Sequence, residues 1–271
     1  MSAVTAAPST LDRPVATTRP VHPPIPLSRV AGVELRKMFD TRSGFWLMAS
    51  IAITAVLATG AVILFAPDDE LTYETFATAI GFPIAVILPM VAILAVTGEW
   101  SQRTGLTTFT LVPHRQRVIG AKLLVSVGIG VVSMLLAGVI GALGNVLGTA
   151  ITGTDLVWNV SATEFAYIIL ANVLGMLIGF MLGVLIRNSP GAIVGYFVYS
   201  FLLPTLSMLL ADSVQWFRDA QSWVDFNFAQ GALFEGQMTG ESWAQLAVAG
   251  TVWLVIPLAV GLGLVMRSEV K

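Results

Sequence analysis

Few residues of this chain are suited to acid–base or nucleophilic chemistry, and none falls into a known catalytic motif. The 271 residues include no cysteine, and His22 and His114 are the only histidines. Disulfides, thiolate zinc sites and cysteine nucleophiles are therefore excluded. The sequence also lacks a Gly-x-x-x-x-Gly-Lys-[Ser/Thr] loop, a His-Glu-x-x-His motif and a Gly-x-Ser-x-Gly elbow. It consequently offers no nucleotide site or catalytic centre of these kinds.

Polar and charged residues gather instead in one segment, residues 98–122. Its composition predicts a surface helix followed by a turn that ends at a proline. The segment places Glu99 at the end of an apolar stretch and offers four basic side chains to solvent: Arg103, Arg115, Arg117 and Lys122. A charged, structured loop of this kind is a surface on which a soluble partner protein could push.

The rest of the chain is dominated by apolar stretches. Hydrophobic residues make up 56% of the sequence and charged residues 11%, whereas a soluble domain carries roughly 25% charged residues. A stretch of about 20 residues crosses the hydrocarbon core of a bilayer. The sequence thus predicts an all-α polytopic membrane protein with six transmembrane helices, at about residues 44–66, 76–97, 123–147, 164–186, 191–211 and 243–266.

The basic residues are sorted by side. Of 14 Lys and Arg, 13 fall in the segments that would share one side, and Arg218 is the exception. Cytoplasmic loops accumulate Lys and Arg, so both termini are expected inside the cell. The same bias explains the charge pattern without a nucleic-acid partner.

An amphipathic helix is predicted just before the first span, over residues 27–42. Such a helix beside a membrane usually lies in the interface plane. Glu34 and Arg42 interrupt its apolar face, which indicates either protein partners or snorkelling and pairing along the helix surface. Residues 1–28 are rich in Pro, Thr, Ala and Ser and are expected to form a disordered cytoplasmic tail, so the permease domain would cover 29–271.

Two features concern the packing and the shape of the spans. Pro83 and Pro89 are expected to kink or locally break the second span. Gly175, Gly179 and Gly183 form a small-xxx-small face, which favours packing within one subunit over a dimer interface.

The external segment 212–242 is rich in aromatic residues, and one or two short helices are expected there. Two interpretations stay open for these helices. They either cover an exit path or anchor the chain in the outer leaflet.

The pattern Gly98-Glu99, Thr104-Gly105, Leu111, Pro113, Arg115 and Lys122 resembles that of the ABC type-2 permeases, the membrane subunits of bacterial ABC exporters. The six spans, the interfacial helix with Glu34, Lys37 and Arg42, the long external segment and the absent nucleotide site also match. The resemblance covers about residues 28–271. It implies that the chain is no enzyme, holds no cofactor itself, and depends on ATP and Mg bound to a partner ATPase.

The resemblance also implies roles for particular residues. Coupling to the ATPase would use a helix around 101–111 together with Glu99, Arg103, Thr104, Pro113, Arg115 and Lys122. The substrate path would lie between this chain and a second copy or sister permease, in a bacterial plasma membrane whose lipid is a further partner of the chain. Its lining candidates come from the second and fifth spans: Thr78, Phe82, Tyr196, Tyr199, Ser200, Phe201 and Thr205.

Two other functions stay open. A non-transporting scaffold or sensor subunit could use the same loop to recruit a partner. A secondary transporter of apolar molecules is the third hypothesis, although the span interiors lack the acidic and basic residues with which ion-coupled pumps usually work. The sequence does not identify a substrate, and its charge-free spans favour hydrophobic or amphiphilic cargo.

Overall fold

The computed structural model describes residues 25–101 and 115–267, which are mostly helical and include no strand. The elements are α1 (Leu27–Asp40), α2 (Arg42–Phe65), the 3-10 turn η1 (Asp68–Glu70), α3 (Tyr73–Ser101), α5 (Arg115–Thr152), α6 (Ala162–Ile186), α7 (Ser189–Phe197), the π-helical turn η2 (Val198–Leu202), α8 (Leu203–Ser213), α9 (Gln215–Val224), α10 (Phe226–Phe234), α11 (Gly240–Gly250), the π-helical turn η3 (Thr251–Val255) and α12 (Ile256–Arg267).

Six helical stretches are long and apolar enough to cross a membrane, which confirms the all-α polytopic fold. The third covers residues 116–152 instead of the predicted 123–147. Its 37 residues would extend over about 55 Å. This length exceeds a hydrocarbon core of about 30 Å, so the ends of α5 must continue into the polar layers. The six spans are Arg42–Phe65, Tyr73–Gly98, Gln116–Thr152, Ala162–Ile186, Ser189–Ser213 and Gly240–Arg267.

The predicted helix before the first span is present as α1. It ends at Asp40, two residues earlier than predicted, because Thr41 begins α2 as its N-cap. The Thr41 hydroxyl accepts a hydrogen bond from the Gly44 amide at 3.1 Å. Most of the predicted N-terminal tail lies outside the described residues.

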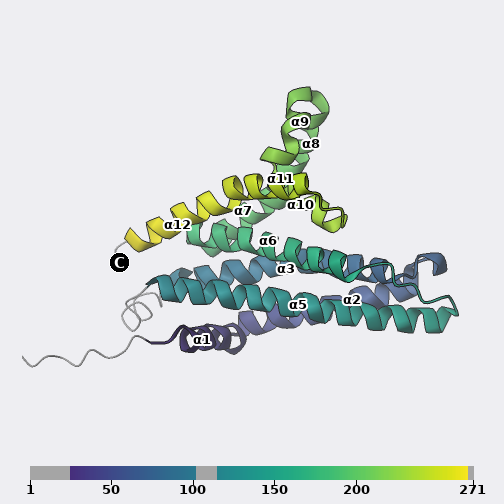
Figure 1. Cartoon of the computed structure of the whole chain (residues 1–271). Coiled ribbons are helices and arrows are strands. Elements are labelled where there is room, and N and C mark those ends of the chain that lie inside the picture. Colours follow the sequence, from purple (N-terminus) through teal and green to yellow (C-terminus); the bar gives the residue numbers. More distant parts are fainter. Residues whose placement is uncertain (1–24, 102–114, 268–271) are drawn as a thin grey trace, which may run out of the picture.

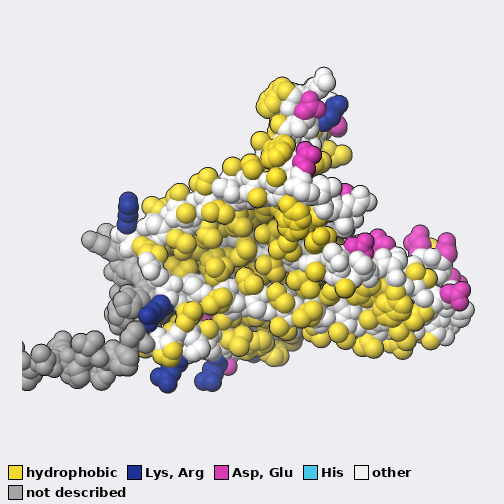
Figure 2. All heavy atoms as spheres, viewed as in Figure 1, with side chains coloured by type: hydrophobic (Ala, Val, Ile, Leu, Met, Phe, Trp, Pro, Cys, Tyr) yellow, Lys and Arg dark blue, Asp and Glu magenta, His cyan; other side chains and the backbone are white. Residues whose placement is uncertain are grey.

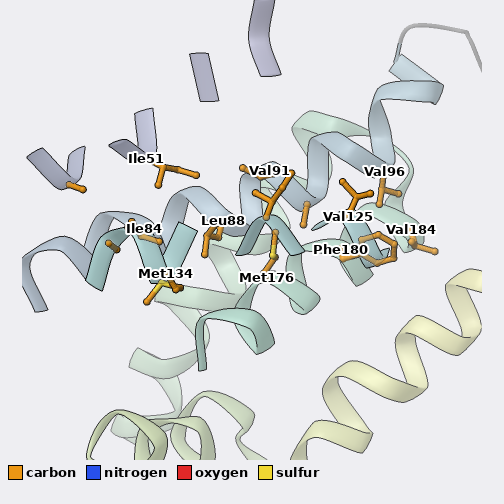
Figure 3. Close-up of a cluster of buried hydrophobic side chains, with 14 of the residues drawn as sticks. Ile51, Ile84, Leu88, Val91, Val96, Val125, Met134, Met176, Phe180 and Val184 are labelled. Atoms are coloured by element: carbon orange, nitrogen blue, oxygen red, sulfur yellow. The ribbon is translucent and has the colours of Figure 1, made fainter. Parts of the chain in front are cut away.

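Helix α3 is the centre of the bundle. In Figure 1 it lies between α6 and the pair α2 and α5, and α3 and α6 form the most extensive helix pair. Figure 3 shows the core that results, in which side chains from α2, α3, α5 and α6 meet. The labelled residues are Ile51, Ile84, Leu88, Val91, Val96, Val125, Met134, Met176, Phe180 and Val184.

Two prolines lie inside α3, and neither ends the helix. Proline has no amide hydrogen, so Pro89 leaves the carbonyl of Ala85, four residues earlier, without its helical donor. The hydroxyl of Tyr196 on α7 donates to that carbonyl at 3.2 Å. A neighbouring helix thus replaces the missing hydrogen bond, which is how proline is tolerated in a membrane span.

The second feature that holds α3 in place is its close approach to α6. A Cβ atom built on Gly179 would lie 2.7 Å from the carbonyl oxygen and 2.9 Å from the Cα of Pro89. Only glycine permits this distance between the two backbones. The predicted glycine face of α6 therefore packs within the chain, since the next glycine, Gly183, faces Val96 and Ile93 of the same helix α3.

Charged side chains lie at the two ends of the long bundle. Figure 2 shows Lys and Arg mainly at the end where α1 lies and α12 finishes, and Asp and Glu at the opposite end and near α9. The broad surface between them is apolar. This distribution is the one that a chain threaded repeatedly through a bilayer requires.

The contact between Gly179 and Pro89 gives a direct test of this packing. We expect Gly179→Ala to lower the midpoint of thermal unfolding, because overpacking a tight contact costs about 1–3 kcal/mol. The matched control is Gly60→Ala in α2, where an added Cβ meets nothing within 4 Å. Thermal unfolding of both variants in the same detergent checks this, and an equal effect of the two substitutions would contradict the assigned contact.

Candidate functional site

The strongest polar cluster joins three helices at the basic end of the bundle. Glu34 of α1 is 4% exposed and Lys122 of α5 is 5% exposed. The Lys122 ammonium donates to Glu34 Oε2 at 2.5 Å and to the Ala95 carbonyl of α3 at 2.9 Å. Lys37, which is partly exposed, donates to the other carboxylate oxygen at 2.7 Å. One carboxylate therefore connects α1 to α5, and its partner lysine connects both to α3.

One part of the apolar face of α1 packs against the bundle, and the other part is exposed at the surface. Val30 is buried, and Ala31 and Met38 pack against the main core on the same side as Glu34. Leu27, Leu35 and Phe39 are exposed at the surface. Glu34 thus pairs with Lys37 along the helix surface, one of the two causes expected for the interruption of the apolar face, and it also pairs with Lys122 in another helix of the same chain.

Further contacts tie the neighbouring helices to the same end. The hydroxyls of Thr97 in α3 and Ser189 in α7 lie 2.7 Å apart. Gln116 of α5 donates to the sulfur of Met266 in α12 at 3.3 Å, and Arg117 donates to the carbonyl of Ile25 at 3.1 Å. The ends of α3, α5, α7 and α12 are therefore linked by side-chain hydrogen bonds, whereas apolar packing alone has no directional preference.

Some of the residues predicted to couple to an ATPase lie within residues 102–114, and the others lie before or after this segment. Arg103, Thr104 and Pro113 lie outside the described residues, as does most of the predicted helix 101–111. Glu99 belongs to α3 and Arg115 to the first turn of α5. Lys122 differs from expectation, because it is buried in the ion pair instead of being offered to solvent. Arg42, from the interfacial-helix group, is exposed in the first turn of α2.

The predicted lining residues of a substrate path separate into two groups. Thr78, Phe82, Phe201 and Thr205 are exposed, and Ser200 is half-buried. Tyr196 and Tyr199 are instead buried, at 5% and 7% exposed. The exposed members lie on α3, η2 and α8 and are available to lipid or to another chain. The Tyr196 hydroxyl donates a hydrogen bond to the Ala85 carbonyl of α3.

The fifth and sixth spans each contain one π-helical turn just before a proline. Pro204 follows η2 and Pro257 follows η3, in each case with one residue between. The amides preceding these prolines, of Leu203 and Ile256, bond five residues back to the carbonyls of Val198 and Thr251. Such turns are frequent at functional sites. The prolines are visible in the sequence, but the change of hydrogen-bond register was not predicted.

The two π-helical turns meet beside α9 and α10. The rings of Tyr199 and Trp253 have centroids 6.0 Å apart. Trp253 Nε1 donates to the Val224 carbonyl at the end of α9 at 2.6 Å, and Asn227 of α10 donates to the Tyr199 carbonyl at 3.3 Å. The prediction of short helices in segment 212–242 is confirmed by α9 and α10, which these bonds fix to the spans.

Two cavities flank the α8–α9 hairpin, which stands away from the other helices in Figure 1. The larger has a volume of about 430 Å³ and includes Asp212, Arg218 and Gln221 in its lining. The smaller, of about 280 Å³, is lined by Tyr199, Leu203, Leu206, Ser207, Leu210, Phe217, Val224, Asp225, Asn227 and Trp253. Asp225 and Asn227 border both.

No protein-family model matches this chain, and the search of curated proteins likewise found no match. The comparisons therefore neither support nor contradict the resemblance to ABC type-2 permeases.

We expect Tyr→Phe substitutions at the two buried tyrosines of the fifth span to affect the midpoint of thermal unfolding differently. Tyr196→Phe leaves the Ala85 carbonyl without a donor, and an unsatisfied buried group costs about 1–3 kcal/mol. Within the described chain, the Tyr199 hydroxyl is buried and has no hydrogen-bond partner. Tyr199→Phe should thus preserve or raise the unfolding midpoint, whereas Tyr196→Phe should lower it. Thermal unfolding of the two variants checks this, and a fall of equal size in both would contradict the assignment.

A second pair of substitutions tests the ion pair. Lys122→Met leaves a buried carboxylate with one partly exposed partner, and breaking a buried pair costs about 3–5 kcal/mol. Lys37→Met removes only the partly exposed lysine, for which about 0–1 kcal/mol is expected. Urea or thermal unfolding should rank the variants in this order. A larger effect at Lys37 would show that the buried pair does not hold α1 on the bundle.

Proposed function

We propose that this chain is the membrane subunit of a bacterial ABC exporter and that it resembles the ABC type-2 permeases in mechanism as well as in sequence pattern. It would form the substrate pathway with a second permease, while a separate ATPase binds ATP and Mg. The coarse basis is the six-span fold. The proposal includes the orientation, with both termini and residues 102–114 on the cytoplasmic side of the plasma membrane.

The observation that carries the proposal is the buried contact among Glu34, Lys122 and Ala95. Residues 102–114 connect the end of α3 to the start of α5, and Ala95 and Lys122 lie on these two helices. A force applied to that connection therefore reaches both helices. Through Glu34 it also reaches α1, so the segment and the interfacial helix would respond as one unit.

This arrangement suits a partner that pushes from the cytoplasm. Closure of two ATPase subunits would move residues 102–114 and α1 together, and packed spans would transmit the movement to the pathway. A ligand that favours one of two conformations is sufficient for such switching. The exposed candidates Thr78, Phe82, Phe201 and Thr205 would then face the second permease across the path.

The secondary-transporter hypothesis receives less support. Among the residues whose burial is described, the buried charged side chains are Glu34 in α1, before the first span, and Lys122 near the start of α5, so neither lies midway along a span. Midplane acids or bases mark ion paths in coupled pumps. A scaffold or sensor subunit would require the same loop but no pathway, and transport in vesicles separates it from the exporter.

The test begins with the neighbouring open reading frame, where we expect a Walker-type ATPase, and uses that protein together with the chain. We expect the two to co-purify and the permease to stimulate ATP hydrolysis. Reversing the charges of Glu99 and Arg103 should reduce this stimulation by about 10-fold or more, because these two charged residues belong to the proposed contact with the ATPase. The control is reversal of an exposed charge with no assigned role, Asp155→Lys in the connection between α5 and α6.

Two results would overturn the proposal. One is normal coupling of ATP hydrolysis to export after reversal of both charges, which would exclude the assigned contact. The other is transport in proteoliposomes that runs on a proton gradient without ATP, which would select the secondary transporter.

A further inference from the structure

The cavity of about 280 Å³ beneath α9 combines three aromatic rings with one carboxylate. Tyr199, Phe217 and Trp253 supply the rings, and Asp225 is the only charged residue among those that line it. Aromatic faces attract cations through their quadrupoles, especially where water is excluded. The lining therefore presents negative potential from both kinds of group to whatever occupies the cavity.

The Asp225 carboxylate has no ion-pair partner among the described residues. Its Oδ1 atom accepts the amides of Asn227 and Phe228 at 2.9 and 3.2 Å, as the N-cap of α10. Arg218, the nearest basic residue along the chain, lines the larger cavity, which Asp225 also borders, but its guanidinium donates to the carbonyls of Ala211 and Asp212. The described chain thus supplies no basic side chain in an ion pair with Asp225, which lies beside apolar side chains.

Apart from Ser207 and Asn227, the other residues that line the cavity are apolar, and most of them are exposed at the surface. Leu206, Leu210 and Val224 are each more than two-fifths exposed, and Leu203 completes this side. The volume is close to the lower limit of about 300 Å³ for small-molecule sites. This volume suits the head group of an amphiphile and the first part of its alkyl chain, while the rest of the alkyl chain follows the exposed leucines.

The back of the cavity is held in a fixed shape. Tyr199 and Trp253 come from the two π-helical turns, and the indole nitrogen of Trp253 is bonded to Val224 at 2.6 Å. Gln221 donates to the hydroxyl of Ser207 at 3.1 Å and fixes α9 on α8. The rings and the carboxylate are therefore positioned before any ligand arrives, which reduces the entropy cost of binding.

We propose that this cavity binds the ammonium group of a cationic amphiphile, with the ammonium between Asp225 and the aromatic rings and the alkyl chain along Leu203, Leu206 and Leu210. The ammonium belongs either to a free amphiphile or to a lipid head group such as ethanolamine. The site does not depend on the proposed export function, and its occupancy is measured without an ATPase.

The experiment measures binding of radiolabelled dodecylammonium to the full chain in nanodiscs of uncharged digalactosyl lipid, with empty nanodiscs subtracted. Wild-type protein should bind dodecylammonium at least 10-fold more tightly than 1-dodecanol, which has the same chain without charge. Asp225→Asn should abolish that preference. Asparagine caps helices as well as aspartate does, so α10 should remain folded.

The matched control is Asp212→Asn, which removes an acid from the neighbouring cavity and should leave dodecylammonium binding unchanged. Displacement of the probe by phosphatidylethanolamine, but not by phosphatidylglycerol, would identify a lipid as the natural source of the ammonium. Absence of displacement would identify a free amphiphile. Equal affinity of wild type and Asp225→Asn for dodecylammonium would overturn the proposal, as would equal losses in the two Asp→Asn variants.

Discussion

The apolar layer offers no hydrogen bonds, so every carbonyl and charge placed in it needs a partner within the protein. Three prolines show how this chain meets that requirement. Pro89 frees the Ala85 carbonyl, and the Tyr196 hydroxyl from another helix bonds to it. Pro204 and Pro257 are each preceded by a π-helical turn, in which the amide before the proline reaches five residues back. The positions of α7, α8 and α12 follow from these local solutions.

The same requirement explains the basic end of the bundle. A buried carboxylate is costly unless it is paired and hydrogen-bonded. Glu34 meets this condition only because α1 lies against α5, where Lys122 also bonds to the Ala95 carbonyl. The interfacial helix is therefore fixed by a directional contact and not by its apolar face alone, three members of which remain exposed.

The sequence predicted those features whose signals are local. Hydropathy located six spans, and aromatic residues indicated α9 and α10. The ends of α5 were missed, because a helix continues through polar residues once the chain leaves the hydrocarbon. The burial of Lys122 was also missed, since its partner lies 88 residues away and nothing near residue 122 indicates it. Tyr196 and Tyr199 look alike in sequence, and only packing gives them different roles.

The two ends of the molecule consequently differ in how they can respond to force. At the basic end, hydrogen bonds and an ion pair join α1, α3, α5, α7 and α12, so these helices would move together. Away from this end, the fifth and sixth spans contain π-helical turns near their middle, and two cavities lie beside α8 and α9. A helix can change register at a π-helical turn by exchanging one set of hydrogen bonds for another. Movement introduced at the basic end would therefore change the shape of the protein around the two cavities.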